Sequence, residues 1–180
     1  MRIALAGNPN SGKTTMFNAL TGRNEKIGNW AGVTVDKKEH PIKKALCGGK
    51  ENLVAVDLPG AYSMSPFTSE ESITSSYIKN EKIDAIVNIV DATNLSRSLF
   101  FTTQLLELGI PMVIALNKAD VNKKKKTVID VDALSRQATE IYNKLKGMGL
   151  DLDKIDTEKV GNFITRFFDQ IMNLINQFIG

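Results

Sequence analysis

The sequence contains few of the residues on which disulfide-rich proteins and histidine-based metal centres depend. Its 180 residues include one cysteine and one histidine. A single cysteine excludes an internal disulfide and suits a reducing compartment, so a cytoplasmic location is expected. His40 has no second histidine with which to share a metal ion and is expected to be solvated. Cys47 precedes two glycines and is expected to be an ordinary thiol exposed in a turn.

Long apolar runs and a strong net charge are also missing. No stretch of about 18 uninterrupted apolar residues could span a bilayer, and the first residues lead straight into a loop motif, which leaves no room for a signal peptide. Lys123 to Lys126 supply four positive charges, and without them the formal net charge of +3 becomes −1. The composition therefore gives no reason to expect a nucleic-acid partner.

The chain opens instead on a phosphate-binding loop. The apolar residues 1–6 end at Gly7, the segment from Gly7 to Thr14 matches G-x-x-x-x-G-K-[ST], and helical spacing follows from Thr15. The pattern predicts a strand, a glycine-bounded loop and a helix, which is the context that this motif requires. Inward-facing backbone N–H groups, the Lys13 ammonium and the helix N-terminus would hold a chain of phosphates, and the Thr14 hydroxyl would bind Mg²⁺. The expected ligand is a nucleoside triphosphate.

A second motif, Asp57-Leu58-Pro59-Gly60, ends a buried strand over residues 52–57. At such a strand end a carboxylate can hold a metal-bound water, and the Gly60 N–H can meet a γ-phosphate. The motif is short, but it follows the phosphate loop at a suitable distance. It is therefore interpreted as the second half of the magnesium site.

A third motif, Asn117-Lys118-Ala119-Asp120, ends a later apolar run. A carboxylate there can accept two hydrogen bonds from the N1–H and the exocyclic amine of guanine, which adenine cannot supply. The stem of Lys118 would cover the base. Guanine is therefore the expected base, since a buried acceptor discriminates strongly against a ligand that lacks the donor.

Strands and helices alternate along the chain, which predicts an open α/β sheet with its ligands at the carboxyl ends of the strands. Residues 83–90 and 110–116 are expected to be parallel strands separated by a helix over 95–108. Residues 33–39 are expected to pair antiparallel with 52–57 at the edge of the sheet, between mobile loops over 23–32 and 58–69. A G domain over residues 1–150 and a C-terminal amphipathic helix over 151–180 are expected, the helix either packing on the domain or docking on a partner.

Four segments together resemble a known family. Residues 7–15, 28–35, 57–63 and 91–95 are similar to the Ras-like GTPases and, more specifically, to the N-terminal G domains of the bacterial ferrous iron transport protein B (FeoB) family. The resemblance covers about residues 1–135. It implies a Ras-like P-loop GTPase fold, with a mostly parallel sheet, one antiparallel edge strand and helices on both faces.

The resemblance also implies roles for individual residues. Thr34 would join Thr14 and Asp57 at Mg²⁺, residues 57–69 would form switch II, and Asn10 would bind K⁺ together with backbone carbonyls near residues 29 and 30. The expected catalytic residues are Asn10, Lys13, Thr34 and Gly60. The residues expected to contact GTP are Gly7, Asn8, Pro9, Asn10, Ser11, Gly12, Lys13, Thr14, Thr15, Gly32, Val33, Thr34, Asp57, Leu58, Pro59, Gly60, Asn117, Lys118 and Asp120.

The sequence departs from the family pattern in two places. Ala61 stands where many GTPases carry a glutamine that orients the attacking water, so another element, such as a K⁺ ion, has to take that role. A Ser-Ala-type motif that contacts guanine from a sixth strand is also missing, because residues 137–150 are predicted to form a helix and a glycine turn.

The leading hypothesis is a GTP-hydrolysing switch domain that depends on Mg²⁺ and is stimulated by K⁺. By resemblance its partner would be the membrane transport domain of the same or a longer polypeptide, which places it on the inner face of the cell membrane. The oligomeric state stays open. The alternatives are a GTP-binding regulatory module with negligible turnover, which Ala61 would suit, and a ribosome- or RNA-associated GTPase, which the charge balance does not favour.

Overall fold

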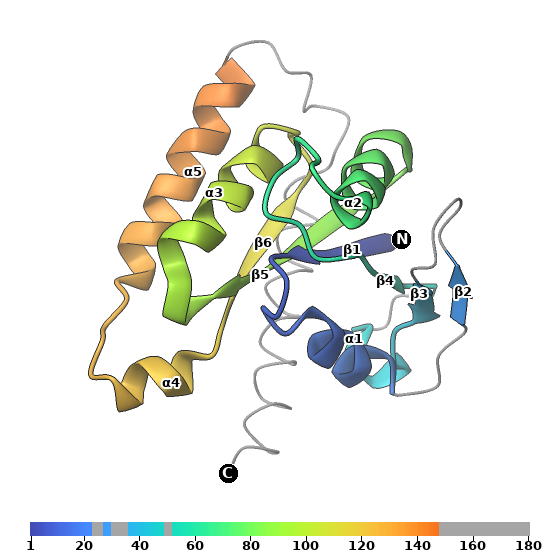
Figure 1. The fold of residues 1–180 in the computed structure, drawn as a ribbon, viewed down its shortest axis with the longest axis horizontal. Coiled ribbons are helices and arrows are strands. Elements are labelled where there is room, and N and C mark those ends of the chain that lie inside the picture. The colour runs from blue at the N-terminus through green and yellow to red at the C-terminus, as the bar shows by residue number, and fades with distance from the viewer. Residues whose placement is uncertain (23–26, 30–35, 49–51, 148–180) are drawn as a thin grey trace.

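A computed structural model describes residues 1–22, 27–29, 36–48 and 52–147, and shows one six-stranded sheet in the order β2-β3-β4-β1-β5-β6 (Figure 1). The strands are β1 (Arg2–Gly7), β2 (Ile27–Asn29), β3 (Asp36–Pro41), β4 (Val54–Asp57), β5 (Ala85–Asp91) and β6 (Met112–Asn117). The pairs β1–β4, β1–β5 and β5–β6 are parallel, while β3 runs antiparallel to both of its neighbours. The α/β class and the mostly parallel sheet are therefore confirmed.

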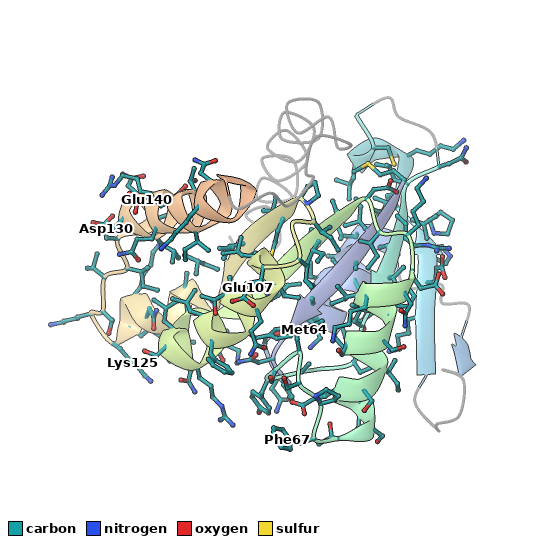
Figure 2. The ribbon with its side chains drawn as sticks, turned by 90° about the horizontal axis from the view of Figure 1, so that it is seen from above. Met64, Phe67, Glu107, Lys125, Asp130 and Glu140 are labelled. Atoms are coloured by element: carbon teal, nitrogen blue, oxygen red, sulfur yellow. The ribbon has the colours of Figure 1, made fainter. Side chains whose placement is uncertain are left out.

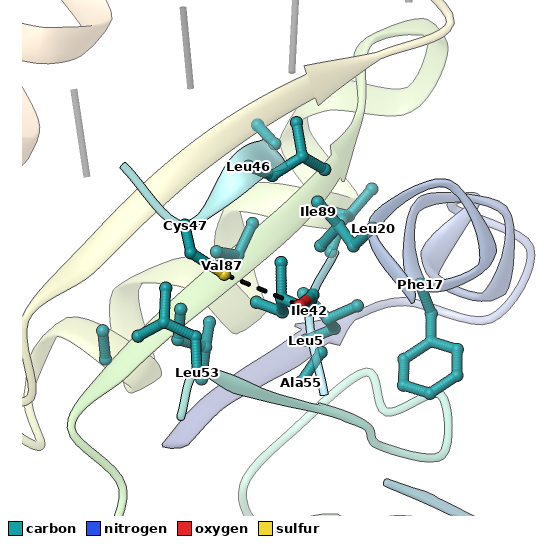
Figure 3. Close-up of a cluster of buried hydrophobic side chains, with 13 residues drawn as sticks. Leu5, Phe17, Leu20, Ile42, Leu46, Cys47, Leu53, Ala55, Val87 and Ile89 are labelled. Carbon is teal, nitrogen blue, oxygen red and sulfur yellow. Dashed lines mark hydrogen bonds between the residues drawn. The ribbon is translucent and has the colours of Figure 1, made fainter. Parts of the chain in front are cut away.

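Helices cover both faces of the sheet. They are α1 (Lys13–Thr21), α2 (Ser69–Asn80), α3 (Leu95–Leu106), α4 (Ala119–Lys124) and α5 (Val131–Gly147), with short 3-10 turns η1 (Lys44–Leu46) and η2 (Ala92–Asn94). Alternate residues of β1 point to opposite faces, as the strand pleat requires. Leu5 packs with Phe17 of α1 on one face, and Ala6 packs with Phe101 of α3 on the other (Figure 3 shows the first cluster). The sheet thus fixes the start of α1 at the carboxyl end of β1.

The strand that was expected at the sheet edge has a further neighbour. Residues 36–41 form β3, and the three residues of β2 pair antiparallel with it on its outer side. The sequence predicts a mobile loop over residues 23–32, because this segment is rich in glycine and asparagine. In the structure β2 forms because β3 offers its free backbone groups, which a propensity argument does not take into account.

The prediction for Cys47 was wrong. The residue is 5% exposed and belongs to the apolar cluster that includes Leu46 and Leu53 (Figure 3). Its Sγ donates hydrogen bonds to the carbonyl oxygens of Lys43, at 3.3 Å, and Ile42, at 3.5 Å, and burial raises the pKa of the thiol. The turn η1, which immediately precedes Cys47, directs the side chain into the core.

The C-terminal end of the described chain is α5. The helix predicted from residue 137 is present within α5, and no strand follows β6 among the residues that the structure describes. The C-terminal amphipathic helix and the proposed boundary at residue 150 lie outside the described residues. Within the described ranges, no helix combines the length and the apolar character needed to cross a bilayer.

Candidate functional site

The three sequence motifs meet at one edge of the sheet. Gly7, Asp57 and Asn117 are the last residues of β1, β4 and β6, and these strands, with β5 between β1 and β6, are adjacent and parallel. Asp91 ends β5 and lies in register with Asn117. Ligands of open α/β sheets bind at this carboxyl edge, outside the strand ends.

The phosphate loop between β1 and α1 has a tightly turned backbone. Asn10 and Gly12 both adopt positive φ angles, of 61° and 99°. A Cβ on Gly12 would lie 2.2 Å from the Nδ2 of Asn117, whose amide donates a 2.8 Å hydrogen bond to the carbonyl oxygen of Ser11. The third motif therefore braces the phosphate loop directly, and only glycine fits at position 12.

Lys13 places a cation inside the loop. Its side chain is 7% exposed, and its Nζ donates a 3.0 Å hydrogen bond to the carbonyl oxygen of Asn8. Burial lowers the pKa of Lys13 to about 8, although the Asp57 carboxylate opposes this shift. A buried ammonium is unfavourable unless an anion pairs with it, so the loop is electrostatically suited to an anionic ligand.

Further polar atoms of the loop are buried beside Lys13. Within the described part of the chain, the hydroxyl of Ser11 and the Oδ1 of Asn8 are buried without a hydrogen-bond partner. The Nδ2 of Asn8 donates to the carbonyl oxygen of Arg97 on α3, at 3.4 Å. Unpartnered buried polar atoms are rare in native proteins and are typical of places where a ligand or water supplies the missing partner.

Thr14 and Asp57 form the second contact between motifs. The Thr14 hydroxyl donates to Oδ2 of Asp57 at 2.8 Å, which joins the start of α1 to the end of β4. Both groups offer the oxygen ligands that Mg²⁺ prefers. In the described ranges no group of three or more His, Cys, Asp or Glu side chains could hold a metal ion. One hydroxyl from Thr14 and one carboxylate from Asp57 fit Mg²⁺, which takes one or two carboxylates and completes its coordination with phosphate oxygens and water.

Gly60 and Ala61 lie against the phosphate loop. A Cβ on Gly60 would lie 2.8 Å from both the nitrogen and the Cα of Pro9, so a larger residue would push the two segments apart. Ala61 is fully buried, and its N–H donates to the carbonyl oxygen of Gly7 at 3.3 Å. Its methyl group belongs to the core cluster around Phe101, so position 61 contributes packing here and no polar group.

The segment after Ala61 has no regular secondary structure but is held by two side chains that the sequence analysis missed. The buried Glu71 carboxylate accepts hydrogen bonds from the backbone N–H groups of Tyr62, at 2.9 Å, and Phe67, at 3.0 Å. The Oε1 of Gln104 on α3 accepts from the N–H of Met64 at 2.7 Å. Met64 is buried, whereas Phe67 is 93% exposed and projects from the molecule (Figure 2).

A sequence signal for Glu71 exists. Thr68 caps α2 by accepting from the N–H of Glu71 at 3.2 Å, so Thr68 to Glu71 matches the S/T-x-x-E pattern of a helix start. The Glu71 carboxylate turns back along the preceding loop, and the N–H groups of Phe67 and Tyr62 lower its pKa, although burial opposes them. Residues 62–67 are thereby anchored at both ends.

We expect Glu71→Gln to lower the free energy of unfolding by about 1–3 kcal/mol at pH 7, because the charged acceptor of two part-buried N–H groups is lost. The folded-state pKa of Glu71 lies below the ordinary value of 4.5, so its contribution is complete above pH 4.5 and is lost as the pH falls through the folded value. Urea unfolding of both proteins between pH 7 and pH 3 measures this. A difference that stays constant down to pH 3 would contradict it, and Glu70→Gln on the exposed face of α2 is the matched control.

The third motif opens α4. Lys118 has a φ of 62° and is the N-cap of that helix, and its Nζ lies 2.7 Å from Oδ2 of Asp91. The buried Asn122 donates to the carbonyl oxygen of Ala92 at 2.8 Å and connects α4 to η2, which directly follows β5. Asp120 lies in the first turn of α4 with an exposed side chain, although the sequence argument treated it as a buried acceptor.

The predicted site residues are thus brought together in part. Those within the described ranges lie along one edge of the sheet and comprise residues 7–15, 57–60, 117, 118 and 120. Gly32, Val33 and Thr34 lie outside the described residues. Sequence reasoning assigned no role to Glu71 and Gln104, which hold the loop after Ala61. Asp91 lies in the segment 91–95 that carries the family resemblance, but it was given no contact with the motifs, whereas in the structure it contacts Lys118.

The fold and the arrangement of the three motifs define a G domain of the P-loop GTPase class. The family model described as "Ferrous iron transport protein B" matches residues 1–145, and the chain belongs to the family of FeoB N-terminal domains.

Individual relatives agree with this assignment. The chain is 49% identical over 139 residues to the Fe(2+) transporter FeoB of Salmonella typhimurium, which is 75% of this chain and 18% of that protein. It also matches the crystal structure of a GDP-bound mutant of S. thermophilus NFeoB, with a TM-score of 0.69 and 50% identity over 76% of this chain and 52% of that one. The cytosolic domain of L. pneumophila FeoB matches with a TM-score of 0.70 and 41% identity, covering 76% of this chain and 53% of that one.

Proposed function

We propose that this chain binds GTP with Mg²⁺, hydrolyses it, and acts as the nucleotide-dependent switch of a ferrous iron transporter. The observation that carries the proposal is the Lys13 ammonium, buried inside a glycine-bounded loop at the carboxyl edge of the sheet. Such a cation is stabilised when phosphate oxygens replace the water it has lost. The S. thermophilus relative crystallised with GDP supports a guanine nucleotide as the source of those phosphates.

In this proposal the phosphate loop binds the β- and γ-phosphates through its backbone N–H groups and Lys13. Thr14 and Asp57, which already contact each other, would hold Mg²⁺ together with Thr34, and Mg²⁺ would neutralise charge on the β- and γ-oxygens. The remaining expected phosphate-side contacts are Gly7, Asn8, Pro9, Ser11, Gly12, Thr15, Gly32, Val33, Leu58, Pro59 and Gly60. The N–H of Gly60 would donate a hydrogen bond to the γ-phosphate, so the position of residues 62–67 would depend on whether that phosphate is bound.

Guanine recognition is assigned to the third motif. Asp120 accepts the two donors of the base, Asn117 ties the motif to the carbonyl of Ser11, and the Lys118 stem covers the base. Because Asp120 is exposed in the structure, its carboxylate is open to an incoming base. In the described part of the chain, no strand beyond β6 is present to add a further contact to guanine.

Catalysis has to work without a polar side chain at position 61. The Ala61 methyl is packed in the core, so it can neither orient a water nor donate to the γ-phosphate. Asn10 is exposed at the turn of the phosphate loop, where its side-chain oxygen is available to a monovalent cation. K⁺ bound there would stabilise the charge that builds up between the β- and γ-phosphates, the role that an arginine finger has in other GTPases.

The proposed role in transport rests on the length of the relatives compared with that of this chain. The chain spans 18% of the length of the first curated relatives it matches, which are Fe(2+) transporters. We therefore propose that it controls a membrane transport domain of the same or a longer polypeptide, from the cytoplasmic side on which the L. pneumophila domain is described. No nucleic-acid partner is proposed.

The test is GTP turnover at saturating Mg²⁺ in potassium and in sodium buffer of equal ionic strength. We expect slow turnover in Na⁺, acceleration of at least severalfold in K⁺, and loss of that acceleration in Asn10→Ala with nucleotide affinity largely retained. Affinity survives because Lys13 and the loop N–H groups bind the ground-state phosphates. Asn143→Ala, on the exposed surface of α5, is the matched control and should respond to K⁺ as the wild type does.

Equal turnover in K⁺ and Na⁺ would overturn the potassium mechanism. Turnover that stays negligible in both buffers, with tight GTP binding, would instead favour the regulatory module that binds GTP without hydrolysing it. Binding of RNA in a filter assay would support the third hypothesis, a ribosome- or RNA-associated GTPase.

A further inference from the structure

Asp91 belongs to none of the three motifs, yet it ends β5 at the nucleotide edge of the sheet. It lies in register with Asn117, the last residue of β6. Its Oδ2 lies 2.7 Å from the Nζ of Lys118, and its Oδ1 accepts both the N–H and the hydroxyl of Thr93, at 2.9 and 2.6 Å. Each carboxylate oxygen of Asp91 therefore binds a different segment: Oδ2 binds the Lys118 ammonium, and Oδ1 binds Thr93 in η2.

The contact with Asp91 fixes the ammonium end of the Lys118 side chain, and the backbone of Lys118 is already fixed. Lys118 sits between Asn117, which is tied to the phosphate loop, and α4, and its φ of 62° is an uncommon conformation for a lysine. A lysine stem has four rotatable bonds and loses entropy when it is ordered. With the ammonium held by Asp91, the stem spans the space between two fixed ends.

The surroundings of the pair favour a lasting contact. The side chains of Lys118 and Asp91 are 35% and 17% exposed, so the pair is less solvated than a surface ion pair. Burial alone would raise the pKa of Asp91, but the hydrogen bonds from Lys118 and Thr93 outweigh it and the pKa is lowered. The carboxylate is thus charged at neutral pH and stays available to the ammonium.

We propose that Asp91 is a positioning residue for guanine recognition: it holds the Lys118 stem across the face of the base and thereby slows nucleotide release. This inference rests on the proposed guanine site. It gives that site a second support, from the end of β5, in addition to the Asn117 contact with Ser11. The Asp91–Lys118 contact supplements Asp120, because Asp120 hydrogen-bonds the edge of the base and does not cover its face.

The experiment measures the release of a fluorescent GDP analogue after mixing with excess GDP, together with the steady-state constants for GTP. Asp91→Asn keeps an oxygen that can accept from Thr93 and removes the charge that holds Lys118. We expect release to be about tenfold faster, with the loss appearing in KM for GTP rather than in kcat. Asp91→Glu, which restores the charge, should recover part of the slow release.

Two further variants separate positioning from folding. Asp84→Asn is the matched control, because Asp84 accepts the N–H of Arg2 at 2.6 Å near the other end of β5, and its release rate should equal that of the wild type. Lys118→Met should release GDP as fast as Asp91→Asn, and the double variant should be no faster than either single one. Lys118→Met alone carries the test if Asp91→Asn does not fold.

Unchanged release in Lys118→Met, or effects of the two changes that multiply in the double variant, would overturn the inference. Either result would leave GDP binding by the wild type intact, and with it the proposed function. Failure of the wild type to bind guanine nucleotides at all would overturn the proposed function itself.

Discussion

Asp120→Asn is expected to weaken GTP binding by at least tenfold while improving the binding of xanthosine triphosphate. A carboxylate complements the two donors of guanine, whereas an amide presents a donor and complements the carbonyl at the corresponding position of xanthine. A site built to pair with a donor rejects the analogue that lacks it by a large factor, so the ratio of the two affinities should change by about 10³- to 10⁴-fold. Competition binding against a fluorescent GDP analogue measures both affinities.

The exposed position of Asp120 helps this experiment. Because the side chain is solvated in the structure, the substitution leaves no unpaired buried group and should leave the melting temperature unchanged. Asp132→Asn in the exposed first turn of α5 is the matched control and should alter neither affinity. If wild type binds GTP and ATP equally well, the assignment of the base is wrong, whatever the variant does.

Lys13→Met should reduce the affinity for GTP and GDP by about 10²- to 10³-fold, which corresponds to about 3–4 kcal/mol of binding free energy. The variant removes the buried cation and retains an apolar stem of similar length. Its stability should move in the opposite direction. Burial lowers the pKa of Lys13 to about 8, which shows that the fold disfavours the charged ammonium, so the uncharged side chain should raise the melting temperature of the nucleotide-free protein.

Lys79→Met, on the exposed side of α2, is the comparison for Lys13→Met and should change neither affinity nor stability. Isothermal titration calorimetry and thermal unfolding provide the two measurements. Nucleotide affinity in Lys13→Met within threefold of the wild type would remove the main support for the phosphate site. A lower melting temperature without nucleotide would show that the ammonium stabilises the fold, contrary to the burial argument.

The sequence predicted the parts of the site that are contiguous in the chain. The loop from Gly7 to Thr14, the end of β4 at Asp57 and the end of β6 at Asn117 each carry their own pattern, and the alternation of strands and helices predicts that they share one edge. The α/β class followed from the same alternation. Local patterns suffice here because each motif includes the strand end that positions it.

Contacts between segments could not be predicted in the same way. The pairs Lys118–Asp91 and Met64–Gln104 join residues that are 27 and 40 positions apart. No local sequence pattern at these residues predicts which residue each one contacts. Strand β2 exists because β3 has a free edge, and Cys47 is buried because η1 turns it inward. Each of these features depends on where another segment lies, which spacing along the chain does not encode.

The burial of Cys47 makes this chain convenient for spectroscopy. Its thiol is covered by the core, its pKa is raised, and the sequence contains no second cysteine. A cysteine introduced at an exposed position such as Ser65, in the loop before α2, would therefore be the one thiol open to a maleimide dye in the folded protein. In the unaltered chain, the rate at which a thiol reagent modifies Cys47 would measure how often the core opens. The same residue therefore adds no signal in the labelling experiment and reports on local unfolding in the second one.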